Sequence, residues 1–127
     1  MKRLISLGVA ALFAACAHDL SLMKKEETLN AYRSAIRWSA FEQASAFRSD
    51  RAPHRRTSAN LKDIHVTGYE ILAEREDKTQ QTLLQTVAIR YYRTGDLIEK
   101  TTMDEQDWRY DPEREKWMLH SALPHFE

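Results

Sequence analysis

Three acidic residues cluster in the second half of the chain, at Asp104, Glu105 and Asp107, directly before Trp108. Two neighbouring carboxylates can divide the roles of general acid and general base when one of them is buried and has a raised pKa. On an antiparallel strand beside a turn we expect solvated carboxylates instead. The chain has no Ser-His-Asp elbow, phosphate-binding glycine loop or dinucleotide fingerprint. The sequence therefore predicts no catalytic residue and a protein that is not an enzyme.

The histidines are too scattered to indicate a metal centre. A zinc site needs three or four converging ligands, and no H-x-H or H-E-x-x-H spacing occurs. Two of the histidines could meet only if their strands lie close together. The sequence predicts no metal and no other cofactor. The histidines are His18, His54, His65, His120 and His125.

Cys16 is the only cysteine, and it follows a short apolar leader. Lys2 and Arg3 supply positive charge, and the apolar run from Leu4 to Phe13 is shorter than the roughly 20 residues that a membrane-spanning helix needs. A positive start, a short apolar core and small residues before a cleavage site are typical of a secretory signal. Cysteines of exported proteins usually occur in pairs, so an unpaired thiol here needs another role.

The segment Phe13-Ala14-Ala15-Cys16 resembles the lipobox of bacterial lipoproteins, with Leu12 one place earlier than usual. The resemblance implies cleavage before Cys16, diacylation of its thiol and, because Ala17 rather than Asp follows, an outer-membrane anchor facing the periplasm. Two alternatives stay open. Ordinary signal peptidase could cut at Ala15-Cys16-Ala17 and release a soluble periplasmic protein, or Cys16 could be an incidental thiol.

The composition indicates one small domain. We expect a signal peptide over residues 1–15, an acylated cysteine and flexible tether over 16–25, and a single domain over 26–127. The 19 basic and 19 acidic residues balance, and loss of Lys2 and Arg3 with the leader gives the mature chain a charge near −2. This charge excludes a strongly basic, nucleic-acid-binding surface.

Residues 26–47 are predicted to form one amphipathic helix. Apolar side chains recur at three- and four-residue spacing, which places them on one face. Trp38 and Phe41 should widen that buried face. The recurring residues are Leu29, Tyr32, Ile36, Ala40, Ala44 and Phe47.

From Leu61 onward the apolar period changes to two, which predicts four strands. A phase change at Gly68 indicates a β-bulge in the first strand. Turns are expected at residues 77–79, 94–96 and 111–115, and the last strand should run from Trp117 to Leu123. The order predicts an α+β fold, with one long N-terminal helix packed on a curved four-stranded antiparallel meander.

A loop over Ser49–Asn60 separates the helix from the strands, and we call it, together with Arg48 at its start, the basic loop. Arg51, His54, Arg55 and Arg56 could contact anionic lipid headgroups or an acidic partner. The alternative is a solvated loop that keeps the domain soluble.

Adjacent Tyr91 and Tyr92 must point to opposite faces of their strand. We expect Tyr92, Trp108 and Tyr110 to line the face of the sheet that the helix leaves open. Exposed apolar patches of this kind usually mark an interface, so this face could serve a homodimer, a protein partner or a small ligand.

The order of one long helix and a bent antiparallel sheet resembles the cystatin-like and nuclear-transport-factor-two superfamily. The tail residues Asp107-Trp108, Asp111-Pro112, Trp117 and Leu123-Pro124-His125-Phe126 resemble those of small bacterial lipoproteins with that architecture. The likeness covers residues 26–126, and it assigns no catalytic acid to this chain.

These observations favour a membrane-anchored periplasmic lipoprotein that acts as a non-enzymatic binding module. It would contact the membrane through its lipid and another protein or envelope component through its sheet face or basic loop. The alternative is a small-molecule carrier or enzyme that uses a pocket between helix and sheet.

Overall fold

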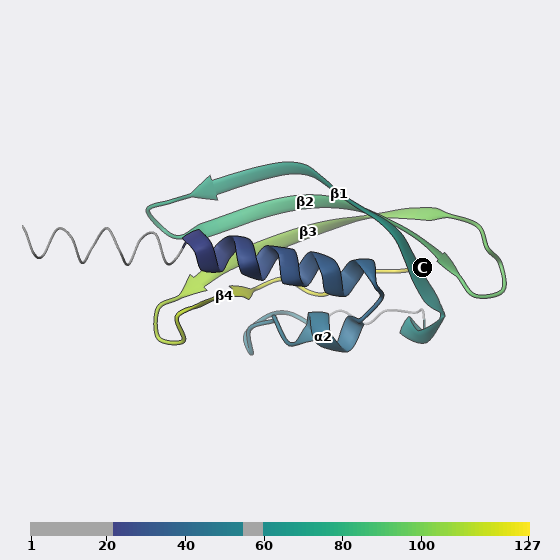
Figure 1. Cartoon of the computed structure of the whole chain (residues 1–127), viewed down its shortest axis with the longest axis horizontal. Helices are drawn as coiled ribbons and strands as arrows, with labels where there is room; N and C mark the ends of the chain where they lie inside the picture. Colours follow the sequence, from purple (N-terminus) through teal and green to yellow (C-terminus); the bar gives the residue numbers. More distant parts are fainter. Residues whose placement is uncertain (1–21, 55–59) are drawn as a thin grey trace, which may run out of the picture.

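The computed structural model describes residues 22–54 and 60–127. Its architecture is α+β, with one main helix over residues 22–37 and one sheet of four antiparallel strands (Figure 1). The strands are β1 (Ile64–Asp77), β2 (Thr82–Arg93), β3 (Lys100–Asp111) and β4 (Lys116–Leu119), and they lie in sequence order as a meander. The predicted sheet topology is therefore confirmed.

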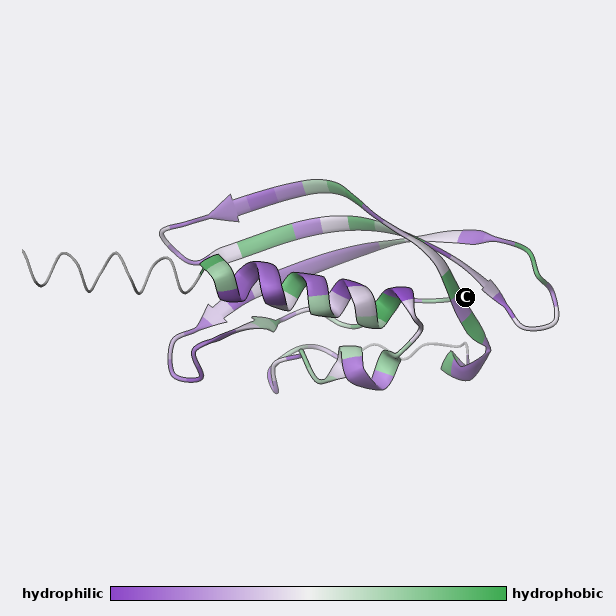
Figure 2. Ribbon diagram, viewed as in Figure 1, coloured by the Kyte–Doolittle hydropathy of each residue, from purple (hydrophilic) through white to green (hydrophobic). Residues whose placement is uncertain are grey.

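The long helix (residues 22–37) is amphipathic, and hydrophobic and hydrophilic residues alternate along it in Figure 2. Tyr32 and Ile36 are fully buried, and Leu29 packs against the same core. The apolar stripe of the sequence is thus the face that packs on the sheet. The helix already includes residues 22–25, which the sequence assigns to the tether.

The single helix expected over residues 26–47 is wrong, because the helix ends after residue 37. The Ala40 amide donates to the Ala35 carbonyl oxygen and the Ser39 amide to the Ile36 carbonyl oxygen, which is a Schellman motif. Its left-handed residue is Ser39, at φ 58°, where glycine is usual. A short second helix, α2 (Phe41–Ser45), follows. Trp38 lies at the break and is 78% exposed, not part of the buried face.

Contacts with β1 hold the helix end in this position. The Val66 amide donates to Ser39 Oγ at 2.9 Å, and Arg37 Nη1 donates to the Val66 carbonyl oxygen at 2.7 Å. These partners lie 27 and 29 residues away in the chain. The break is therefore set by tertiary contacts that no local pattern contains.

The strands contain two irregularities in their pairing. The shift between Val66 and Gly68 confirms the predicted bulge, and a second shift occurs between Ile71 and Ala73. β4 ends at Leu119, earlier than predicted, and the chain continues beside β3. There the Asp107 amide donates to Ser121 Oγ, and Thr102 Oγ1 donates to the His125 carbonyl oxygen.

The core lies between the helices and one face of the sheet. Trp108 is fully buried at its centre, with ring-centroid distances of 5.1 Å to Tyr32 and 6.4 Å to Phe47. Gln106 carries a buried polar network beside this ring. Its Nε2 donates to Tyr69 Oη and to Asp104 Oδ2, and its Oε1 accepts from Trp108 Nε1, all at 2.9 Å.

Candidate functional site

A trough of about 900 Å³ crosses the face of the sheet opposite the long helix. All four strands or their extensions contribute to it, and the basic loop adds Pro53 and His54 at one wall. The trough is open to solvent, since two of its apolar side chains, Leu84 and Met103, are 41% and 55% exposed. Its lining includes Ala73, Leu84, Met103, Glu105, His120 and Leu123.

Strand alternation explains which side chains face the trough. Leu84 stands between buried Leu83 and Gln85, and Met103 precedes buried Asp104. Because neighbours in a strand point to opposite faces, burial of one set against the helices leaves the other set in the trough. We call this surface the open-face trough below.

Alternation also separates the three clustered acids. Asp104 is only 5% exposed and belongs to the buried polar network, so the expectation that it is solvated is wrong. Glu105 is exposed and lines the trough. Asp107 is half-buried and accepts two hydrogen bonds from Arg109, at 3.2 and 2.9 Å, which raise the pKa of Arg109. Asp104 and Glu105 therefore do not form a carboxylate pair.

Two tyrosines near the buried carboxylate have raised pKa values. Burial is the largest cause for both, and the charge of Asp104 adds to it. The pKa of Tyr69 rises to about 12, and that of Tyr32 rises well above its ordinary value. Both hydroxyls stay protonated at neutral pH. Tyr32 Oη is buried and has no hydrogen-bond partner among the described residues.

His120 lies in the wall of the trough, and its pKa is lowered chiefly by burial and then by the Arg109 guanidinium. The unfolded chain therefore binds a proton at this site more readily than the folded chain. Folding stability from His120 is greatest above the ordinary histidine pKa of about 6.5 and decreases as the pH falls below it.

Replacing His120 with Gln should make the domain less sensitive to acid. The free energy of unfolding from urea titrations should fall less between about pH 7.5 and pH 5.5 in His120→Gln than in the unmodified chain, because one proton-linked cost of folding is removed. An equal fall in both proteins would show that His120 titrates alike in the folded and unfolded states.

The basic loop is held to the tail of the chain by Arg48. Its side chain donates to the carbonyl oxygens of Ser121 and Pro53 and contacts His54 Nδ1 at 3.4 Å. Arg51 and His54 are exposed, and His54 lines the trough. The structure thus brings the candidate binding residue His54 next to the sheet face. Arg55, Arg56 and Cys16 lie outside the described residues.

The expected aromatic lining of the open face is wrong for two of its three residues. Trp108 is fully buried, and Tyr110 packs against the same core with its ring centroid 5.8 Å from that of Trp117. Tyr92 does lie on the open face, half-buried and stacked on His65 with a centroid distance of 4.9 Å. It is not among the residues that line the trough.

The register between β2 and β3 explains why Trp108 is buried instead of lining the open face. Trp108 pairs with Leu83, which shares a face with Tyr91 rather than with Tyr92. The residues missed from the sequence are Leu84, Met103 and His120. The alternation of side chains along β2 and β3 indicates two of them. Leu84 and Met103 are apolar, and each interrupts a run of polar residues at the positions that point away from the helices.

Within residues 22–54 and 60–127, no helix is long and apolar enough to cross a membrane. The same residues contain no group of three or more His, Cys, Asp or Glu side chains that could hold a metal ion. Comparison of the chain with protein-family models, curated proteins and solved structures finds no match.

Proposed function

We propose that the chain is a lipid-anchored binding module of the bacterial cell envelope. The leader and Cys16 support acylation at the first residue of the mature chain, on the periplasmic side of the outer membrane. Cleavage before Cys16 makes the long helix the first element of the mature protein. The six Cα–Cα steps from Cys16 to residue 22 span at most about 22 Å. The domain is therefore held close to the membrane surface.

We infer that the module binds a segment of another envelope protein in the open-face trough. Small-molecule sites enclose most of their ligand within about 300–1,000 Å³. A trough of about 900 Å³ that leaves Leu84 and Met103 about half exposed does not enclose a ligand of that size. Apolar side chains between charged ones, such as Glu105 and Arg75, suit a protein surface with an apolar centre and a polar rim.

Tethering favours such an interaction. A domain fixed to a membrane meets a partner in the same membrane at a raised effective concentration. Contacts that are weak in solution then suffice for occupancy. The exposed side chains of Arg51 and His54, beside the trough wall, would orient an acidic partner.

Photo-crosslinking in intact envelopes tests this function. A photoreactive residue in place of Met103 should give one dominant crosslinked product, and Leu84→Glu in the same chain should reduce its yield about tenfold by placing a charge in the apolar floor. The matched control carries the photoreactive residue at Glu42, which is exposed on α2 away from the trough.

Two results would contradict the proposal. Equal products from positions 103 and 42 would show that the trough is not a preferred contact. A product with twice the mass of the chain would show that the trough serves self-association rather than binding of a different protein.

A further inference from the structure

A second, smaller cleft lies on the helix side of the sheet. It has a volume of about 260 Å³ and is bounded by the long helix, β1 and β2. The helix contributes Glu26, Leu29, Asn30 and Arg33, and the strands contribute Tyr69, Ile71, Glu74 and Gln85. We call this space the helix–sheet cleft. It lies on the opposite face of the sheet from the open-face trough.

Local geometry brings charged groups to both walls of the cleft. Glu26, Asn30 and Arg33 stand at i, i+4 and i+7, so they share one side of the helix. Glu74 reaches the cleft because of the irregularity between Ile71 and Ala73. After that shift Glu74 pairs with Gln85, whose side chain is buried on the helix face. In a regular strand Ala73 would take that place.

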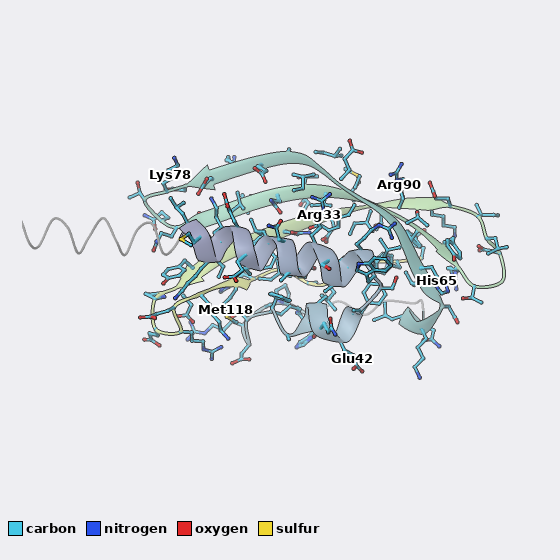
Figure 3. All side chains as sticks on the ribbon, viewed as in Figure 1. Arg33, Glu42, His65, Lys78, Arg90 and Met118 are labelled. Carbon is cyan, nitrogen blue, oxygen red and sulfur yellow. The ribbon has the colours of Figure 1, made fainter. Side chains whose placement is uncertain are left out.

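The polar groups are fixed by neighbours. Gln85 Nε2 donates to Glu74 Oε1 at 2.5 Å, which leaves the second carboxylate oxygen of Glu74 for another donor. The Arg33 guanidinium carbon lies 5.7 Å from the centre of the Tyr69 ring, and Figure 3 shows Arg33 projecting from the helix toward the strands. Tyr69 Oη accepts from Gln106, so its own proton remains to be donated.

The charges of the cleft do not balance. Two carboxylates, Glu26 and Glu74, face one guanidinium, Arg33, which leaves one negative charge in excess. Lys25 does not supply the missing cation, because its Nζ pairs with Glu76 Oε1 at 2.7 Å. A ligand that complements this set carries two cationic groups and one anionic group.

We propose that the helix–sheet cleft binds a free basic α-amino acid. Arg33 presents parallel N–H donors that match a carboxylate, with the amide of Asn30 beside it. Glu74 and Glu26 accept the two ammonium groups. The ligand carries one net positive charge and neutralises the cleft. The proposal does not rest on the proposed partner binding in the open-face trough, although Glu74 and Gln85 line both spaces.

Isothermal titration calorimetry on the full chain in detergent micelles tests the proposal, with L-lysine as the probe. L-lysine should bind, L-alanine should bind about tenfold more weakly because one ammonium contact is lost, and L-glutamate should not bind. Arg33→Met and Glu74→Gln should each weaken lysine binding by about tenfold or more. The matched control is Arg75→Met. Arg75 directly follows Glu74 in the sequence, but it lines the trough.

The proposal is overturned if L-lysine gives no heat of binding at millimolar concentrations to a chain that unfolds cooperatively in urea. It is also overturned if lysine binds and Arg33→Met and Glu74→Gln leave its affinity unchanged. Neither result affects the crosslinking expected from Met103, so failure of this site and failure of the trough are distinguishable.

Discussion

Replacing Trp108 with Ala should lower the free energy of unfolding by about 3–5 kcal/mol. The side chain is fully buried, and its ring contacts Tyr32 and Phe47 edge-on, so truncation leaves a cavity between the long helix and the sheet. It also removes the indole donor from Gln106 Oε1, which leaves a buried acceptor without that bond. The free energy of unfolding of a small domain is only about 5–15 kcal/mol, so this loss is a large fraction of the total stability.

Urea unfolding followed by circular dichroism measures this loss. The matched control is Trp38→Ala, which removes the same side chain from a position that is 78% exposed and should change stability by no more than about 0.5 kcal/mol. Similar effects of the two substitutions would contradict the placement of Trp108 at the centre of the core.

Replacing Cys16 with Ser should release the protein from the membrane. Each buried methylene of an acyl chain contributes about 0.8 kcal/mol to membrane binding, and two or more chains anchor a protein stably. Serine has no thiol to acylate, and within the described residues no helix replaces the anchor. Immunoblots of membrane and soluble envelope fractions should show the unmodified chain with membranes and Cys16→Ser in the soluble fraction or retained as uncleaved precursor.

The control for this experiment is Ala17→Ser, which makes a neighbouring change of similar size and keeps the thiol. It should fractionate with membranes like the unmodified chain. Processed Cys16→Ser that remains with membranes would contradict anchoring through this residue, and the alternative of ordinary signal-peptidase release predicts soluble protein for all three.

The helix and the strands could be predicted from periodicity, because burial of one face imposes a regular spacing on each element. Tyr32, Ile36 and Ala44 lie in the core as the apolar stripe predicts. The break at Ser39 could not be predicted, since its left-handed conformation depends on Val66 of β1 rather than on a glycine in the sequence. Propensity favours a continuous helix there, and the tertiary contacts override it.

The candidate site was harder to predict than the fold. Which face of β3 carries Trp108 depends on its register with β2, and a shift of one residue would exchange every side chain between the faces. For the same reason, the sequence could not show that Asp104 is buried and Glu105 is exposed. The trough wall further depends on the tail around His120, which leaves β4 earlier than alternation indicates.

The intact mass of the mature chain extracted from membranes tests the anchored module most directly. The account predicts a polypeptide that begins at Cys16, with the added mass of at least two acyl chains on this first residue. A chain with a free Cys16 thiol, or one that begins at a different residue, would contradict it.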